Sequence, residues 1–252
     1  MSHVQQRSDS ADYVNKIEAN VMDGFVSQFA PNPDMCLECT YLPCSVMHYG
    51  AYAFSVSKGA APTLEPRDPL NRITMGIQKG LTAYDICTIN REYGITDARI
   101  CNTPSGCKFG TDFDGEFACD CMCASGLTGS DCGTFQDGTT GIALASGETH
   151  TLSTSGLTYD ENQQLNYMVY STDESLHIKY TFREMVVEDD VDCYWDQFNY
   201  WVNTSVLYCP YTICGDHSGF SGVTSSNFFY AFFHSDDYWN ERGFVIDFEV
   251  VA

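Results

Sequence analysis

Short runs of alternating apolar and polar residues fill the second half of the chain from about Gly141 onward. The clearest runs are HIKYTF, NYWVNTSVLY, NFFYAFF and GFVIDFEVV, and Gly, Ser, Asn and Asp residues separate them. Runs of four to eight residues rich in β-branched and aromatic side chains are typical of strands. The pattern therefore predicts an all-β unit in this half.

The first hundred residues contain one convincing helical pattern, Leu81 to Tyr93 (LTAYDICTINREY). Apolar side chains recur there near helical spacing, Thr82 or Asp85 can serve the N-terminal turn, and Gly94 follows as a stop. The stretch from Ala30 to Cys44 is rich in Pro and Cys, which predicts a loop.

Between these parts, six cysteines crowd into 32 residues together with several glycines. A segment this small cannot bury a sufficient core, so disulfides are expected to stabilise it. Spacing alone leaves many pairings of six cysteines open. The cysteines are Cys101, Cys107, Cys119, Cys121, Cys123 and Cys132.

The chain has 13 cysteines among 252 residues. So many indicate a secreted, disulfide-bonded protein, and an odd number requires at least one thiol to lack a partner within the chain. Met1 to Val14 shows neither a basic segment nor an apolar one of the kind that begins a signal peptide. We therefore expect the sequence to represent part of a longer secreted product. No run of apolar residues is long enough to predict a membrane span.

The net charge is -22, from 34 acidic and 12 basic residues. Residues 1 to 100 hold 8 basic and 11 acidic side chains (net -3), and the remainder hold 4 and 23 (net -19). This acidity argues against nucleic acid or an anionic membrane as a partner and favours cation binding.

Three stretches of the first segment resemble the astacin family of zinc endopeptidases, in the order expected. SVMHYG (45–50) resembles the family's Met-turn, the helix LTAYDICTINREYG resembles its last catalytic-domain helix, and HVQQRSDSADYV resembles the residues that follow the zinc helix. The resemblance implies that His3 is the third zinc ligand, that Met47 lies beneath the metal, and that Tyr49 stabilises the oxyanion near the zinc. Val4 departs from the family, which has Glu at that position.

The zinc motif of that family is incomplete in this sequence. None of the six histidines is followed by Glu, so no HExxH is present, and two ligands and the general base are missing. We expect the chain to begin just inside the motif and to be inactive on its own. Tyr93-Gly94-Ile95 also departs from the Tyr-Gly-Cys with which the family's catalytic domain ends.

Three cysteines of the first segment allow two interpretations. Cys36, Cys39 and Cys44 could be three ligands of a metal site, but without a clear fourth ligand loop disulfides are the favoured interpretation. Cys87 lies on the expected inner face of the helix and is most simply a buried thiol.

The cysteine cluster resembles an EGF-like module, carried by its six cysteines with Gly126 and Gly129 in the last loop. The resemblance implies the pairs Cys101 to Cys119, Cys107 to Cys121 and Cys123 to Cys132. Its simplest role is that of a rigid spacer.

Residues 141 to 252 resemble a CUB domain, carried by Cys193-Tyr194-Trp195-Asp196, Cys214-Gly215, Phe233-His234-Ser235-Asp236 and Gly243-Phe244. The resemblance implies a Cys193 to Cys214 disulfide and calcium bound by Glu188, Asp196 and Asp236. The alternative for these carboxylates is a solvated acidic loop, because 188 to 192 is a charge run. Leu165 to Val169 lacks the cysteine of the family's first disulfide. Asn203 begins an N-glycosylation sequon.

Together these patterns predict a multidomain chain. Its expected parts are a C-terminal α+β remnant of a metzincin-type catalytic domain at 1–99, an EGF-like module at 100–133 and an all-β CUB sandwich at 134–252. The order is that of a secreted astacin-like zinc metalloendopeptidase, whose complete form acts on a protein or peptide substrate and whose CUB domain can bind a basic protein. The alternative is a non-catalytic extracellular protein that binds other proteins in a calcium-dependent way through its EGF-like and CUB modules.

Overall fold

The computed structural model describes residues 3–35, 37, 39–68, 71–76, 81–94, 107–109, 121, 123, 126–154, 158–191, 193–202 and 209–252. The chain forms two compact units. Unit 1 comprises Met1–Asn102 and Phe113–Cys119, and unit 2 comprises Thr103–Asp112 and Asp120–Ala252. No helix in the described ranges combines the length and the apolar character that crossing a bilayer requires.

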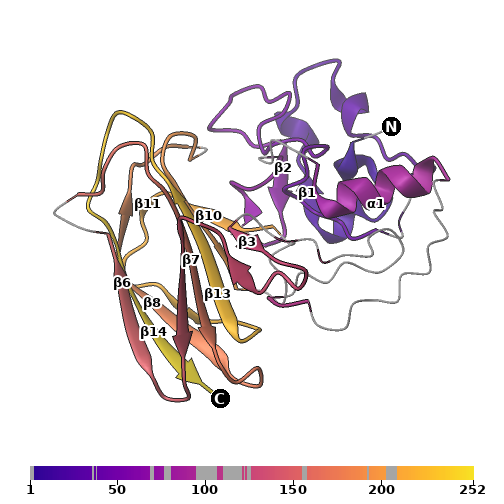
Figure 1. Ribbon diagram of the computed structural model, residues 1–252. Coiled ribbons are helices and arrows are strands. Elements are labelled where there is room, and N and C mark those ends of the chain that lie inside the picture. The colour runs from indigo at the N-terminus through magenta and orange to yellow at the C-terminus, as the bar shows by residue number, and fades with distance from the viewer. Residues whose placement is uncertain are drawn as a thin grey trace. The chain divides into compact units, whose positions relative to one another are not determined.

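Unit 1 contains little regular secondary structure (Figure 1). Strands β1 (Val14–Lys16) and β2 (Leu64–Pro66) form a short antiparallel pair, and α1 spans Ala83–Glu92. Short 3-10 turns make up most of the remaining regular structure, and they are η1 (Val4–Gln6), η2 (Ser10–Asp12), η3 (Glu18–Asn20) and η4 (Val26–Phe29).

Helix α1 lies where the apolar spacing predicted it, and both candidate capping residues take part in its first turn. The Thr82 hydroxyl accepts a hydrogen bond from the Asp85 N–H at 3.1 Å, and the Asp85 carboxylate accepts from the Thr82 N–H at 2.8 Å. This reciprocal capping satisfies two N–H groups that the helix itself cannot pair. At the other end Gly94 has a φ of +60°, a left-handed conformation that glycine adopts at low cost.

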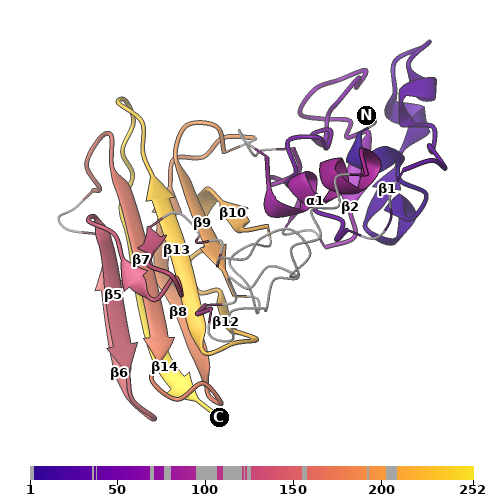
Figure 2. The ribbon, with the colours of Figure 1, turned by 45° about the vertical axis from the view of Figure 1, so that its right-hand side comes forward.

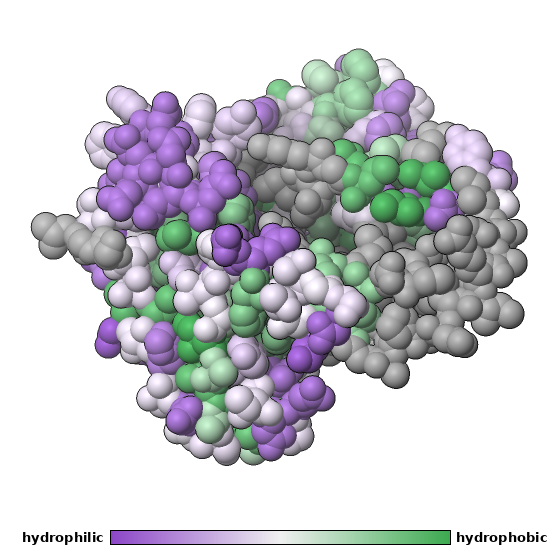
Figure 3. Space-filling model, viewed as in Figure 1, coloured by the Kyte–Doolittle hydropathy of each residue, from purple (hydrophilic) through white to green (hydrophobic). Residues whose placement is uncertain are grey.

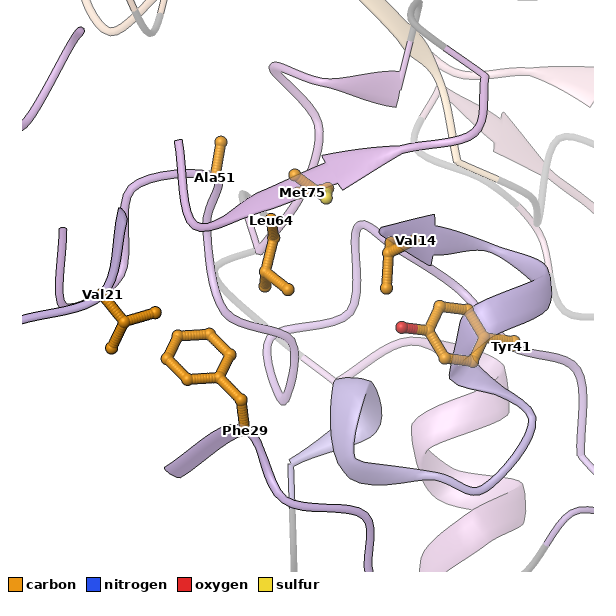
Figure 4. Close-up of a cluster of buried hydrophobic side chains, with 7 residues drawn as sticks. All are labelled: Val14, Val21, Phe29, Tyr41, Ala51, Leu64 and Met75. Carbon is orange, nitrogen blue, oxygen red and sulfur yellow. The ribbon is translucent and has the colours of Figure 1, made fainter. Parts of the chain in front are cut away.

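A cluster of buried apolar side chains holds unit 1 together in place of extended sheet or helix packing (Figure 4). Its members come from segments far apart in the sequence. Leu64 is fully buried and Val14 nearly so. The cluster consists of Val14, Val21, Phe29, Tyr41, Ala51, Leu64 and Met75.

The prediction that Cys87 is a buried free thiol is wrong, because Cys87 of α1 is bonded to Cys39. Helical spacing shows which side of a helix faces inward, but it does not show which loop lies opposite. Cys44 is also disulfide-bonded, so neither Cys39 nor Cys44 can supply a thiolate to a metal. Loop disulfides are therefore correct for these two residues, and Cys36 lies outside the described residues.

Unit 2 is dominated by two stacked sheets (Figures 1 and 2). The first has the order β10 (Tyr211–Ile213), β9 (Gln197–Trp201), β13 (Phe228–His234), β7 (Gln164–Ser171), β5 (Thr139–Leu144). The second has the order β11 (Gly215–Asp216), β8 (His177–Val187), β14 (Gly243–Val251), β6 (Thr149–Ser153), and β12 (Ser221–Val223) pairs with β8. All pairs are antiparallel except β5 with β7.

The core of the sandwich is aromatic. Buried positions alternate with more exposed ones along β8 and β14, as expected for strands with one face on a core. Rings from both sheets meet, such as Phe182 with Phe198 and Phe229 with Phe248. The predicted strands within 177–182, 227–233 and 243–251 are confirmed, and β9 accounts for the described part of the fourth run.

The cysteine-rich segment packs directly on this sandwich. Its described part contains the hairpin β3 (Leu127–Thr128) and β4 (Thr134–Phe135) and two disulfides, Cys107–Cys121 and Cys123–Cys132, which are pairs that the EGF-like resemblance implies. Phe109 and Phe135 meet Tyr170, and Phe109 also meets Phe228 of β13. The implied pair Cys101 to Cys119 lies outside the described residues.

We expect Asp85→Ala to destabilise unit 1 by about 2 to 3 kcal/mol. The change removes the cap of α1 and leaves the buried Ser45 hydroxyl, which donates to Asp85, without its acceptor. Amide hydrogen exchange of α1 in the full chain measures the effect, and Glu65→Ala, at the exposed position of β2, is the control. Unchanged exchange in Asp85→Ala would show that the cap and this hydrogen bond do not support the unit.

Candidate functional site

The structure brings together the three residues that the astacin resemblance singles out. The N–H of Val4 donates to the Met47 carbonyl at 2.9 Å, and the N–H of Tyr49 donates to Gln5 Oε1 at 3.1 Å. These two hydrogen bonds hold the segment after His3 against the turn at Met47. The rings of His3 and Tyr49 consequently lie 4.3 Å apart between centroids.

A buried polar pair fixes the turn itself. Ser45 Oγ donates to Asp85 Oδ1 at 2.5 Å and accepts from the Met47 N–H at 2.9 Å. Both Ser45 and Asp85 are buried, so each needs these partners. Asp85 thus caps α1 and anchors the turn. Sequence reasoning identified the first role and missed the second, because the contact joins residues 40 positions apart.

His48 is a structural residue within this turn. Because a carbonyl oxygen only accepts hydrogen bonds, Nδ1 carries the proton and donates to the Tyr49 carbonyl at 2.6 Å, and Nε2 accepts from the Tyr41 hydroxyl at 2.7 Å. Burial lowers the pKa of His48 to about 4, so the ring is neutral at physiological pH. With both ring nitrogens engaged, His48 has no lone pair to offer a metal.

The described residues do not fit a complete zinc site around His3. Catalytic zinc takes about three protein ligands and leaves a position open for water. Among the parts of the chain that the structure describes, His3 belongs to no group of three metal-binding side chains. The residues present place a phenol beside one imidazole, which alone does not make a zinc site.

Three carboxylates converge at one end of the sandwich. Glu188 follows β8, Asp196 precedes β9, and Asp236 lies two residues after β13. One ligand oxygen from each lies within 4.8 Å of the others. Hydrophilic residues gather over this end of the sandwich, where the loops after β8 and β13 lie (Figure 3).

The three carboxylates repel one another, and one of their oxygen atoms has no hydrogen-bond partner. Burial and the neighbouring carboxylates of Asp196 and Asp236 raise the pKa of Glu188. Burial also raises the pKa of Asp196, although hydrogen bonds from Tyr159 and the Asp236 N–H oppose the shift. Glu188 Oε2 is buried and has no hydrogen-bond partner. A divalent cation would satisfy this oxygen and remove the mutual repulsion, so the three residues fit Ca²⁺.

Tyr159 and a disulfide shape this group. The Tyr159 hydroxyl donates to Asp196 Oδ2 and accepts from the Glu188 N–H, and the Asp236 N–H donates to Asp196 Oδ1 at 2.7 Å. Cys193 is bonded to Cys214, which is the pair that the CUB resemblance implies. Sequence reasoning missed Tyr159, since nothing near it in the chain indicates a metal site.

The remaining predicted features are only partly described. In the acidic run after β8, the Asp190 carboxylate accepts from the Tyr194 N–H at 3.1 Å, so this carboxylate has a protein partner. Asp192 and Asn203, which begins the sequon, lie outside the described residues. Cys209 is disulfide-bonded.

Two family models match the chain. Residues 1–94 match the astacin peptidase family, and residues 141–248 match the CUB domain. Blastula protease 10 of Paracentrotus lividus is 28% identical over 259 aligned positions, which cover 99% of this chain and 42% of that protein. Zinc metalloproteinase nas-36 of Haemonchus contortus is 38% identical over 141 positions, covering 54% of this chain and 22% of that protein.

Solved structures with local likeness include one protease and one CUB domain. High choriolytic enzyme 1, a hatching enzyme zinc-protease from Oryzias latipes, is 29% identical, with a TM-score of 0.34 over 37% of this chain and 46% of that one. The calcium-bound CUB2 domain of MASP-1 is 19% identical, with a TM-score of 0.36 over 43% of this chain and 97% of that one.

The chain spans about two fifths of the length of Blastula protease 10 and of Protein SpAN from Strongylocentrotus purpuratus, and it matches both along nearly its whole length. The chain therefore contains a segment at residues 1–94 that matches the astacin family of peptidases and a segment at residues 141–248 that matches the CUB domain.

Proposed function

We propose that this chain acts within a secreted, astacin-like zinc metalloendopeptidase that hydrolyses peptide bonds, and that the 252 residues alone do not perform the reaction. The observation that carries the proposal is the fixed turn of Ser45 to Tyr49 against the segment after His3. It supports a role in presenting His3 and Tyr49 to one catalytic centre.

In that centre, zinc would act as a Lewis acid toward the peptide carbonyl. His3 would be one of its ligands, and the turn at Met47 would support the site, because it is hydrogen-bonded to the segment after His3. The Tyr49 phenol would donate a hydrogen bond to negative charge developing on the substrate. The two further histidines and the glutamate of the zinc motif are not in this sequence, so they would have to be supplied from outside these 252 residues.

We expect the purified chain to bind less than one equivalent of zinc and not to hydrolyse denatured casein, because one imidazole cannot hold catalytic zinc. Metal analysis after dialysis against zinc and a protease assay test this. The control is His3→Ala, which should behave like the unchanged chain in both measurements. One equivalent of zinc together with hydrolysis that is lost in His3→Ala would contradict the proposal.

A second function is supported by a separate observation, the convergence of Glu188, Asp196 and Asp236. We propose that they bind Ca²⁺ and that the calcium-ordered loops recognise a basic segment of an extracellular protein. The acidity of residues 101 to 252 suits such a partner. In this proposal the cysteine-rich segment is an EGF-like spacer, residues 100–133, before a CUB domain that begins near residue 134.

We expect calcium to raise the Tm of unit 2, because it binds the assembled carboxylates of the folded state only. At a calcium concentration about 100-fold above Kd the stabilisation is about 2.7 kcal/mol, which corresponds to several degrees. Asp236→Asn should weaken calcium binding at least about tenfold, because it removes a charged ligand. Differential scanning calorimetry with and without a chelator measures the shift.

Asp237→Asn is the matched control for this experiment. It removes the same charge from the neighbouring position, which lies outside the group of three carboxylates. The control should keep the full calcium shift. If both variants lost the calcium-induced rise in Tm equally, the rise would come from the overall acidity of the domain and not from this site. If calcium did not raise the Tm of the unchanged chain, the calcium proposal would be wrong.

A further inference from the structure

Tyr238 is the most exposed of the large apolar and aromatic side chains among the described residues, at 78%. It lies on the loop between β13 and β14, close to the carboxylate group but outside it. Trp239 beside it is 57% exposed. Both rings are therefore open to solvent on one loop.

The loop presents Tyr238 between two fixed points. The Asp236 carbonyl accepts from the Asn162 N–H at 2.7 Å, and the Glu241 carbonyl accepts from the Tyr159 N–H at 3.2 Å. Between them, the Tyr238 N–H donates to Asp236 Oδ1 at 2.9 Å and so forms a turn. The side chain of Tyr238 is therefore displayed at the tip of an anchored loop, where an enzyme can reach it.

The charge around this tip is negative. Asp236 and Asp237 come immediately before Tyr238, and Glu241 follows three residues later. The nearest cation in the chain is Arg242, which pairs with Glu184 at 2.7 Å. A transferase whose donor is a polyanionic sulfonucleotide has a cationic active site, and an acidic segment that carries an accessible phenol complements such a site.

We propose that Tyr238 is a site of tyrosine O-sulfation. The phenol oxygen attacks the sulfur of 3′-phosphoadenosine 5′-phosphosulfate, and an S–O bond forms as the bond from sulfur to the 5′-phosphate oxygen breaks. The phenol proton passes to a base of the transferase, and adenosine 3′,5′-bisphosphate leaves. No electrons are transferred, and the product is an aryl sulfate that carries one permanent negative charge.

The other exposed tyrosines of the described residues lack this combination. Tyr13 stacks on Tyr41 with ring centroids 4.3 Å apart. Tyr93 follows α1 and lies two residues after the basic Arg91. Tyr194 has acidic neighbours, but it adjoins the Cys193 disulfide and packs on Trp195 at 4.9 Å. Tyr194 is therefore the appropriate control, because it is exposed and has acidic neighbours, but the disulfide and the Trp195 ring constrain it.

In the cell this modification rests on the proposed secretion of the chain, since sulfonucleotide-dependent tyrosine transferases work in the secretory pathway. The added charge would lie two residues from Asp236. It would strengthen the attraction of this face for a basic partner and for Ca²⁺.

The test incubates the purified full chain with a tyrosylprotein sulfotransferase and ³⁵S-labelled 3′-phosphoadenosine 5′-phosphosulfate. The unchanged chain and Tyr194→Phe should take up about one sulfate per chain, and Tyr238→Phe should take up none. Asp237→Asn should slow labelling several-fold, because it removes the charge next to the phenol. Fragment mass spectrometry locates the ester and separates it from phosphate by its loss of SO₃.

Two results would overturn the proposal: equal labelling of Tyr238→Phe and the unchanged chain, or no labelling of the unchanged chain while an acidic tyrosine peptide is labelled. Retention of the unchanged Tm by Tyr238→Phe shows that a loss of label is not a loss of folding. Expression behind a signal peptide tests secretion separately. A chain that is retained in cells but labelled in the tube would count against the proposed secretion and leave Tyr238 as the acceptor.

Discussion

Repulsion among like charges governs one end of the sandwich. Backbone and phenol hydrogen bonds hold Glu188, Asp196 and Asp236 within reach of one another, and none of the three takes part in an ion pair among the described residues. Folding the chain without a cation leaves Glu188 Oε2 buried and unpaired. The strands that end at this point therefore assemble an anionic group whose stability depends on what it binds, and the loops that carry exposed aromatic residues are anchored to the same group.

Unit 1 has one α-helix, four short 3-10 turns and one short strand pair in its described part, so it cannot depend on extended sheet or helix packing. Its loops are held by the buried cluster around Leu64, the Cys39–Cys87 disulfide and the polar contact of Ser45 with Asp85. Because Asp85 serves both the helix and the turn, the position of Tyr49 is tied to the first turn of α1. A change at the helix N-terminus is thereby transmitted to the site by two hydrogen bonds.

Local patterns predicted much of this structure. Alternating apolar and polar residues predicted β8, β13 and β14. Helical spacing of apolar residues, together with Thr82 and Gly94, predicted α1. Both signals depend only on residues that are neighbours in the chain. The resemblance to CUB domains implied that Glu188, Asp196 and Asp236 form one group, and the structure places them together. Contacts between distant segments were not predictable: Cys87 with Cys39, Asp85 with Ser45, and Tyr159 between two carboxylates. Each depends on how loops cross, for which a single sequence carries no periodic signal.

The contact of the cysteine-rich segment with the sandwich has a mechanical consequence. Gly141 of β5 lies so close to the Phe135 ring that a Cβ there would meet ring carbons at 2.3 to 2.8 Å. Phe109 also packs against Tyr170 and Phe228. These close contacts restrict rotation of the β3–β4 hairpin relative to the sheet. A force applied to the sandwich would therefore be passed to the hairpin through these aromatic contacts. The hairpin would then rotate together with the strands beneath it.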